Sequence, residues 1–290
     1  MRLQPRYRPH FTTALAVAII LAGCASYHEA RLSLVSPYSL ASAIRGARSV
    51  SLTVYMLSPY SAVTKALAAD GARATVLLDG YSFGAARRDA RAAARFLRQS
   101  GVSVLWSRSY WHLKSALVGQ ALYLDTENFG THGFLVRDRA SDDLALVRAA
   151  LHGALGCDAR LCTGKWLALQ QEAAVIAAGH GPLDVQTESF GGNTPVLRAM
   201  IARARAGDRV TLAVNANEAR GSASQWAIAL AERAHIRVIG VQGTEKMAVQ
   251  SGEAWFGSAN LTDALHRQAD LGVVTRSPSI IANLHAAFGH

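Results

Sequence analysis

The chain has 290 residues, half of them hydrophobic, and a formal net charge of +10 at pH 7. This length suits one two-lobed unit or two domains. The apolar content supports a large buried core, which excludes proteins that have no hydrophobic core. The charge favours anionic over cationic partners without distinguishing lipid headgroups from nucleic acid, and a basic surface that only faces solvent is the alternative.

Residues 1–23 have the composition of a bacterial secretion signal. Arg2, Arg6 and Arg8 precede an apolar run over 14–22, and the segment has no acidic residue. The run is shorter than the roughly 20 apolar residues that a transmembrane helix needs. Without this segment the net charge falls by three, from +10 to +7.

The segment ends in Leu21-Ala22-Gly23-Cys24, which resembles the lipobox of bacterial lipoproteins. The resemblance implies that Cys24 is lipidated after cleavage, and a plain signal peptide with an incidental cysteine is the alternative. Acyl chains on Cys24 would anchor the chain stably, because one chain binds a membrane only marginally and more than one holds it. Since the next residue is Ala25 and not the Asp associated with inner-membrane retention, we expect the periplasmic face of the outer membrane.

Helical and extended patterns then alternate along both halves of the chain. Helices are predicted over Tyr38–Arg48, Ala62–Ala69, Arg87–Gln99, Pro195–Ala206 and Ala223–Ala234, and strands over Val50–Met56, Ala72–Leu78, Val102–Trp106, Arg209–Val214 and Ile236–Val241. Strands that alternate with helices of this length indicate right-handed βαβ crossovers and a largely parallel sheet.

Two features of the first half have a functional and a simpler explanation. The predicted helix over 87–99 carries Arg87, Arg88, Arg91, Arg95 and Arg98. This row would suit a polyanion, but spacings of three and four residues more commonly make a solvated helix face. Asp79-Gly80 ends a predicted strand, where α/β sheets usually place ligands, but a simple turn is the commoner explanation.

The middle of the chain contains two cysteines, Cys157 and Cys162. A local disulfide suits an oxidising periplasm. If both residues lay on one helix, however, five positions apart, their side chains would diverge too far to bridge. A metal site would need more ligands, because His152 and His180 lie at no regular spacing.

Two stretches about 130 residues apart carry the same polar pattern. Residues 112–129 read HLKSALVGQALYLDTENF, and residues 244–261 read TEKMAVQSGEAWFGSANL. At identical spacing they align His112 with Thr244, Lys114 with Lys246, Gly119 with Ser251, Thr126 with Ser258 and Asn128 with Asn260. A strand, Phe134–Arg137 or Leu271–Thr275, and then a helix follow each stretch. The pattern indicates an internal duplication whose two copies pack as a pseudo-dimer with facing sites.

This pattern resembles the motif of the phospholipase D superfamily, His-x-Lys, four residues, Asp, and then Gly-Ser-x-Asn. The resemblance covers most of the chain after residue 23 and implies an α/β, two-lobed phospholipase D-like fold, with two βαβ repeats packed as a pseudo-dimer and the site between them. It divides the chain into a signal peptide (1–23), a first repeat (24–140), a helical connector (141–182) and a second repeat (183–290). The second repeat is expected to be shorter by one βα unit.

Enzymes of this superfamily use one motif histidine to attack a phosphodiester, forming a phosphohistidine, and the other to protonate the leaving alcohol, without a metal or other cofactor. The resemblance therefore makes His112, Lys114 and Lys246 the expected catalytic residues, and Asn128, Ser258 and Asn260 the expected phosphate ligands. Asp270 stands where members carry an acid that hydrogen-bonds a catalytic histidine, so it is expected to support the site. No metal and no cofactor are expected.

The motifs also depart from the family pattern. Thr244 replaces the second histidine, Gly119 and Ser251 replace the motif acids, and Asp125 followed by Thr126 replaces Gly-Ser in the first motif. The hydroxyl of Thr244 is too weak an acid to protonate an alkoxide, and general acid help typically contributes about 10² to 10⁴-fold. Candidate replacements are Glu127, His132 and Glu245, although Glu245 should face away, because strand residues two apart share a face and neighbours do not.

Three functional interpretations follow. The first is a phosphodiesterase of reduced activity that acts on phospholipid headgroups or nucleic acid, since neutral imidazole can attack phosphorus while lysines neutralise its charge. The second is a catalytically dead, membrane-anchored pseudoenzyme that binds phosphate or phospholipid. The third, a reused fold without a phosphate site, is disfavoured, because it gives no physical reason to keep buried lysines facing one cleft. No obligate protein partner is expected.

Overall fold

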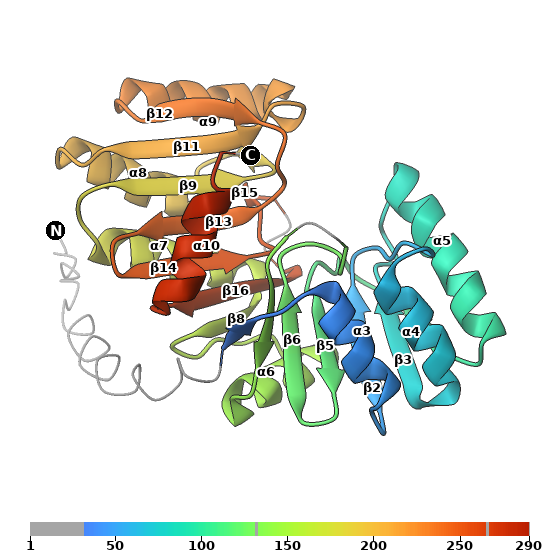
Figure 1. The fold of residues 1–290 in the computed structure, drawn as a ribbon. Coiled ribbons are helices and arrows are strands. Elements are labelled where there is room, and N and C mark those ends of the chain that lie inside the picture. Colours follow the sequence, from blue (N-terminus) through green and yellow to red (C-terminus); the bar gives the residue numbers. More distant parts are fainter. Residues whose placement is uncertain (1–31, 131–132, 265–266, 290) are drawn as a thin grey trace, which may run out of the picture.

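The computed structural model describes residues 32–130, 133–264 and 267–289 (Figure 1). The predicted signal peptide, the lipidation site Cys24 and the candidate acid His132 lie outside the described residues. Within the described residues, no helix is both long and apolar enough to cross a membrane.

The described residues form two lobes, each built on a seven-stranded sheet (Figure 1). The strand orders are β1-β7-β6-β5-β2-β3-β4 and β12-β11-β9-β13-β14-β16-β8. The elements of the first lobe are β1 (Ser33–Leu34), α3 (Pro37–Arg45), β2 (Val50–Val54), α4 (Ala62–Asp70), η2 (Gly71–Arg73), β3 (Ala74–Leu78), α5 (Gly84–Gln99), β4 (Ser103–Trp106), β5 (Ser115–Val118), β6 (Ala121–Asp125), β7 (Leu135–Asp138) and α6 (Ser141–Leu151).

The elements of the second lobe are β8 (Leu161–Gly164), α7 (Lys165–Ala178), β9 (Leu183–Thr187), β10 (Phe190–Gly191), α8 (Pro195–Arg205), β11 (Val210–Asn215), η3 (Glu218–Arg220), α9 (Ser222–Arg233), β12 (Arg237–Val241), β13 (Lys246–Gln250), β14 (Glu253–Gly257), β15 (Leu261–Thr262), β16 (Ala269–Thr275) and α10 (Pro278–Ala287). The helices and strands predicted from sequence are all present, with ends moved by a few residues. The two-lobed α/β expectation is therefore confirmed.

Local sequence explains where several helices begin. The side chains of Ser36, Ser61 and Thr194 accept hydrogen bonds from backbone N–H groups three residues ahead, which caps α3, α4 and α8. Pro37 and Pro195 occupy the first turns of α3 and α8, where a missing N–H costs nothing.

The sheets are mixed, not largely parallel as the alternation of elements predicts. Strands β2, β3 and β4 run parallel, as do β9, β11 and β12, but β5 and β13 join them antiparallel. The reason is that each motif forms a hairpin, β5 with β6 and β13 with β14. Gly119 and Gly252 have positive φ angles of 61° and 79° at these turns, which explains a glycine at the first motif's acid position.

The expected helical connector over 141–182 is wrong in one respect, because it contains a strand of the second sheet. β8 pairs antiparallel with β16 at the edge of that sheet (Figure 1). In the first sheet β1 pairs antiparallel with β7 in the same way. Helix α7 follows β8 as α3 follows β1, so the second lobe is not short by one βα unit. A strand of four residues has too little alternation to be recognised in sequence.

Alternation along the motif strands divides their side chains between two cores. Leu113 and Leu117 join Met247 and Val249 in one hydrophobic cluster that combines residues of both lobes. The alternate residue Ala116 packs into the core of the first lobe and Ala248 into that of the second. Because the hairpins of both lobes share one core, the two motifs face each other.

Cys157 and Cys162 form a disulfide, with Cα atoms 4.2 Å apart. Cys162 lies on β8 and Cys157 in the turn before it, where the two residues also form an isolated β-bridge. Since they share no helix, the geometric objection to a disulfide does not apply.

Candidate active site

The two motifs meet at the carboxyl ends of β2 and β9. His112 of the first motif contacts Tyr55 just after β2, and Lys246 of the second contacts Glu188 just after β9. The backbone N–H of His112 donates to the carbonyl of Ala269, 2.8 Å away, and Trp111 forms a β-bridge with the same residue. The first motif is therefore fastened directly to β16 of the second lobe.

His112 is held in its neutral form by its surroundings. Burial, and then the charges of Lys114, Lys246 and Lys165, lower its pKa well below the usual 6.5. The ring of Tyr55 packs edge-on against the imidazole at a centroid distance of 4.4 Å. Among the described residues no side chain hydrogen-bonds the imidazole. A neutral histidine keeps a lone pair, so His112 can act as a nucleophile near pH 7.

Lys114, Lys165 and Lys246, whose charges act on this histidine, are each only 4% exposed. We call these four residues the interlobe site. Burial and the charge of Lys246 lower the pKa of Lys114, although acidic neighbours oppose the shift. The Lys114 ammonium has no hydrogen bond or ion pair within the described part of the chain. A buried cation without a direct partner is costly, so it favours binding of an anion.

Lys246 differs from Lys114 because it has a carboxylate partner. Its ammonium donates to Glu188 at 2.8 Å and to the carbonyl of Thr244. Burial would lower the pKa of Lys246, but Glu188 and Glu127 outweigh it and raise that pKa. Conversely, burial would raise the pKa of Glu188, but Lys246 above all lowers it. Glu188, which directly follows β9, was not singled out from sequence.

Lys165 was also missed from sequence. It is the first residue of α7, and its ammonium donates to Thr262 Oγ1 and to the carbonyl of Ala264, both at 2.7 Å. Burial lowers its pKa, although Asp270 and Asp263 oppose the shift. Lys165 lies far along the chain from both motifs, inside the expected connector, so no sequence signal could have connected it to them.

The two motif asparagines occupy equivalent positions. The side-chain carbonyl of Asn128 accepts from the N–H of Met56 at 3.2 Å, and that of Asn260 accepts from the N–H of Ser189 at 3.0 Å. Each asparagine thereby holds the chain just beyond β2 or β9. Their amide NH₂ groups remain as donors, and that of Asn260 helps to lower the pKa of Glu188, after the larger effect of Lys246. The expected phosphate role is compatible with these donors.

Ser258 does not fit its expected role as a phosphate ligand. It is fully buried, and its hydroxyl donates to Asp270 Oδ1 at 2.5 Å and accepts from the N–H of Leu271 at 2.9 Å. The other carboxylate oxygen of Asp270 accepts from Gln268 at 3.0 Å. Asp270 thus supports the site through Ser258, and it makes no hydrogen bond to His112 in the described residues. Burial raises the pKa of Asp270, while Ser258 and the lysines oppose this.

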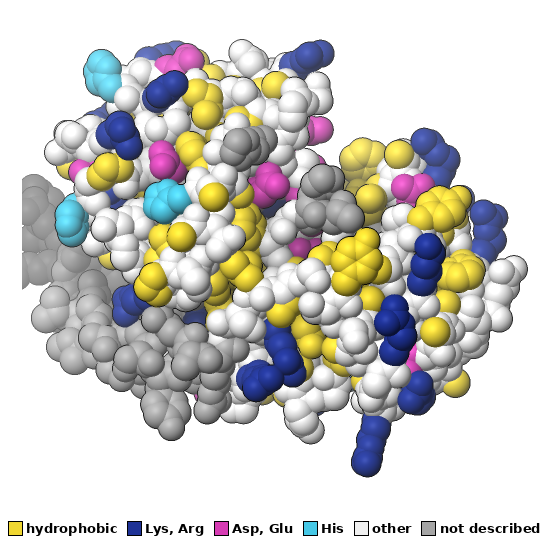
Figure 2. All heavy atoms as spheres, in the orientation of Figure 1, with side chains coloured by type: hydrophobic (Ala, Val, Ile, Leu, Met, Phe, Trp, Pro, Cys, Tyr) yellow, Lys and Arg dark blue, Asp and Glu magenta, His cyan; other side chains and the backbone are white. Residues whose placement is uncertain are grey.

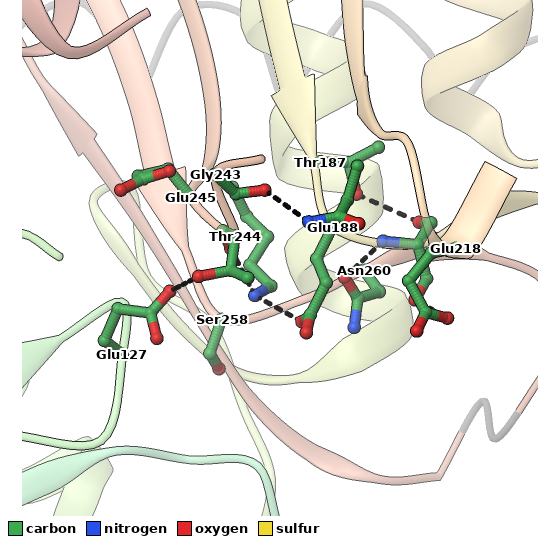
Figure 3. Close-up of polar contacts among 12 residues, drawn as sticks. Glu127, Thr187, Glu188, Glu218, Gly243, Thr244, Glu245, Ser258 and Asn260 are labelled. Carbon is green, nitrogen blue, oxygen red and sulfur yellow. Dashed lines mark hydrogen bonds and ion pairs between the residues drawn. The ribbon is translucent and has the colours of Figure 1, made fainter. Parts of the chain in front are cut away.

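Thr244, which replaces the second histidine, meets a carboxylate from the other lobe. Its hydroxyl donates to Glu127, and Figure 3 shows the two side chains pointing toward one another. Glu245 points away, as expected, and accepts from Gln186 at 3.0 Å. A carboxylate from the first motif, Glu127, therefore lies beside Thr244, the residue that stands in place of the second motif histidine.

The space for Glu127 depends on a glycine. The N–H of Thr126 donates to the carbonyl of Phe134, and that of Ser258 donates to the carbonyl of Leu271, so Gly133 is the counterpart of Asp270. A Cβ on Gly133 would collide with the side chain of Glu127. The first lobe has thus lost the acid at this position, and Glu127 fills the volume.

Asp125 is a further buried acid in the first motif, where the family pattern has glycine. Burial raises its pKa to about 7, although the N–H groups of Phe129 and Glu127 oppose the shift. Its carboxylate accepts from the N–H of Phe129 at 2.5 Å, which closes the loop that carries Glu127 and Asn128. No cluster of His, Cys, Asp and Glu able to hold a metal occurs in the described ranges.

No family model matches the sequence, and no curated protein matches it. Solved structures match its fold. One is polyphosphate kinase from Porphyromonas gingivalis, at a TM-score of 0.60 and 15% identity, covering 86% of this chain and 44% of the kinase. Another is phosphatidylserine synthase from Haemophilus influenzae Rd KW20, at a TM-score of 0.59 and 10% identity, covering 89% of this chain and 85% of the synthase. The chain therefore spans less than half of the kinase.

Both likenesses extend over most of this chain and so include both lobes. The two-lobed phospholipase D-like fold expected from the motifs is therefore confirmed. At these identities the likeness concerns the fold alone, and the chemistry has to be argued from the side chains of this chain.

Proposed function

We propose that this chain is a metal-independent phosphodiesterase of the phospholipase D type, with His112 as its nucleophile. The observation that carries the proposal is a neutral histidine whose pKa is lowered by burial and by the charges of buried lysines, Lys114, Lys246 and Lys165. These cations would neutralise a phosphodiester and stabilise the charge that develops on its equatorial oxygens. The amides of Asn128 and Asn260 would add donors from both lobes.

In the proposed reaction an imidazole nitrogen of His112 forms a bond to phosphorus while the bond to the leaving oxygen breaks. The leaving oxygen takes a proton from Glu127, which this step requires in its protonated form and which replaces the absent second histidine. Water then attacks the phosphohistidine, the P–N bond breaks, and the water proton passes to Glu127. Among the nearby carboxylates, Glu188 is less suited to this role, because Lys246 lowers its pKa and keeps it ionised.

The test compares two substrates. A nitrophenyl phosphodiester needs no proton on its leaving group, whereas an unactivated dialkyl or nucleotide diester does. Glu127→Gln should reduce turnover of the unactivated diester by about 10²-fold and change that of the nitrophenyl diester little. Glu245→Gln is the matched control, because this carboxylate faces away from the site.

Equal losses on both substrates would refute Glu127 as the acid. Restoring Thr244→His should increase turnover of the unactivated diester more than that of the activated one. If the wild type cleaves neither substrate and Thr244→His gains nothing, the phosphodiesterase proposal fails.

The alternative is a phosphate-binding pseudoenzyme. Two observations favour it. No described side chain hydrogen-bonds the imidazole of His112, and Glu188 already pairs with Lys246. This alternative predicts that inorganic phosphate or sulfate binds between Lys114 and Lys246 without any turnover. Crystals soaked in sulfate, together with the activity assays, distinguish the two functions.

We further propose that Cys24 anchors the protein to the periplasmic face of the outer membrane. The support for this is the lipobox-like sequence before Cys24. Cys24→Ser should move the protein from the membrane fraction to the soluble periplasmic fraction. Unchanged membrane association would refute lipidation at this residue.

A further inference from the structure

A second cationic surface lies on the first lobe, beside α5. A cleft of about 660 Å³ is bounded by α5 and by the chain that follows β3 and β4. Its arginines are Arg87, Arg91, Arg95, Arg98 and Arg108, and we call it the arginine cleft. Figure 2 shows basic side chains on the first lobe, including the side that carries α5, with hydrophobic and uncharged side chains between them.

The sequence of α5 places four of these arginines on one face. Arg87, Arg91, Arg95 and Arg98 recur at spacings of four, four and three residues, which bring side chains together along a helix. Like charges at such spacings destabilise a helix. Within the described ranges, no arginine of the cleft has an ion-pair partner, and no carboxylate lines the cleft. A solvated face explains the spacing but not the concave surface.

Two of these arginines are held in place by backbone carbonyls. Arg87 donates to the carbonyls of Gly80 and Ser82 at 3.0 and 3.1 Å, and Arg98 donates to that of Val104 at 2.9 Å. A guanidinium has five N–H donors, so each keeps donors for a phosphate. Because these side chains are already ordered, less entropy is lost when an anion binds.

Aromatic rings also line the arginine cleft. Tyr81 and Trp106 contribute to its wall, and Tyr81 is 48% exposed. The Tyr81 ring lies 5.0 Å from that of Tyr110, and its hydroxyl donates to the carbonyl of Arg108 at 3.1 Å. Positive grooves with fixed aromatic faces are the usual means of binding single-stranded nucleic acid, in which bases are free to stack.

One carboxylate links the arginine cleft to the interlobe site. Asp79, at the end of β3, accepts from the N–H of Tyr81 and from that of Trp111, the latter at 2.6 Å. Tyr81 lines the cleft, and Trp111 directly precedes His112. The cleft residues that follow β3 and β4 therefore lie at the same end of the first sheet as His112, which contacts Tyr55 just after β2.

We propose that the arginine cleft binds the backbone of single-stranded nucleic acid and delivers a phosphodiester to His112. The proposal rests on the proposed function and names its substrate class. A nucleic acid strand carries a phosphate at every nucleotide, so it engages the cleft and the interlobe site together. A phospholipid places its phosphate at a bilayer surface, which a concave cleft fits poorly.

The first experiment measures binding of a fluorescent oligothymidylate by anisotropy, with every protein carrying His112→Ala so that no cleavage occurs. Arg91→Gln combined with Arg95→Gln should weaken binding at least about tenfold and reduce the slope of log affinity against log salt by about 1.4, because each phosphate contact contributes about 0.7 on a single strand. Arg88→Gln combined with Arg237→Gln removes the same charge outside the cleft and should have little effect. Circular dichroism checks that each variant is folded.

The second experiment identifies the ligand. Tyr81→Leu should weaken binding of oligothymidylate but not of inorganic polyphosphate, because only the former has bases. Equal effects on the two ligands would overturn the assignment to nucleic acid. Loss of binding to anionic vesicles in the arginine variant, without oligothymidylate binding in the parent, would indicate a membrane surface and would also overturn it.

The two proposals fail in different ways. If oligothymidylate binding depends on the arginine cleft but neither diester is cleaved, the cleft assignment stands and the enzymatic function fails. If the nitrophenyl diester is cleaved but both double variants bind oligothymidylate equally, the cleft assignment fails and the phosphodiesterase remains.

Discussion

The two lobes share one topology but have diverged at the residue that follows each central strand. After β2 this residue is Tyr55, which packs against His112, and after β9 it is Glu188, which pairs with Lys246. In the first lobe the residue at this position therefore places an uncharged ring against His112, whereas in the second lobe it places a carboxylate against Lys246. Duplicated backbones can thus keep a site's location while its chemistry is divided between the copies.

A second divergence concerns the acids. Asp270 of the second lobe is replaced by Gly133 in the first, and Glu127 occupies the space beside this glycine. The carboxylate of Glu127 then reaches Thr244, where the second lobe has no histidine. Gly133 of the first lobe therefore leaves space for Glu127, whose carboxylate contacts Thr244 of the second lobe.

The largest difference between lobes is expected at the aligned pair His112 and Thr244. His112→Ala removes the proposed nucleophile and should reduce turnover of the nitrophenyl diester by at least about 10³-fold. Thr244→Ala should reduce it by less than about tenfold, because this leaving group needs no acid. Absorbance assays of kcat measure both variants. Equal losses would contradict the division of roles.

A smaller difference is expected at Asp125, whose counterpart is Gly257. The folded pKa of Asp125 is about 7, against 3.8 for the ordinary group. Between these pH values the folded state keeps a proton that the unfolded state has lost, so stability decreases as pH rises from about 4 to about 7 and then levels off. Asp125→Asn should remove this loss, on the order of a few kcal/mol.

Urea unfolding at about pH 5 and about pH 8 measures this effect. Asparagine keeps an acceptor for the N–H of Phe129, so the variant isolates the charge. If wild type and Asp125→Asn lose the same stability between the two pH values, Asp125 does not carry the buried charge.

The smallest effect is expected on the titration of His112. Lys114 and then Lys165 lower its pKa, so removing either charge should raise it, and Lys114→Met should raise it more than Lys165→Met. Because the imidazole is active when neutral, a raised pKa moves the acidic limb of kcat/KM to higher pH. NMR titration of the ring resonances reports the pKa directly. A shift for Lys165→Met that exceeded the shift for Lys114→Met would contradict this order.

Much of the fold was predictable from local pattern. Alternating helices and strands were recognised because each is long enough to show its period, and the motif spacing revealed the duplication. The strand Leu161–Gly164 was missed because four residues show no clear alternation. The antiparallel hairpins were missed because pairing direction depends on turns such as that at Gly119, and not on strand composition.

By itself the sequence determined that the chain is duplicated, that His112 has no histidine counterpart, and that Lys114, Lys246 and both asparagines recur at one spacing. Such features are local, and identical spacing on equivalent strands is enough to show them. Only the tertiary structure decided that Lys165 joins the site, that the hydroxyl of Ser258 is hydrogen-bonded to Asp270, and that Glu127 accepts a hydrogen bond from Thr244. Those contacts connect residues from separate lobes or distant segments, so no local pattern encodes them. The ionisation of these side chains depends on their burial in the shared site.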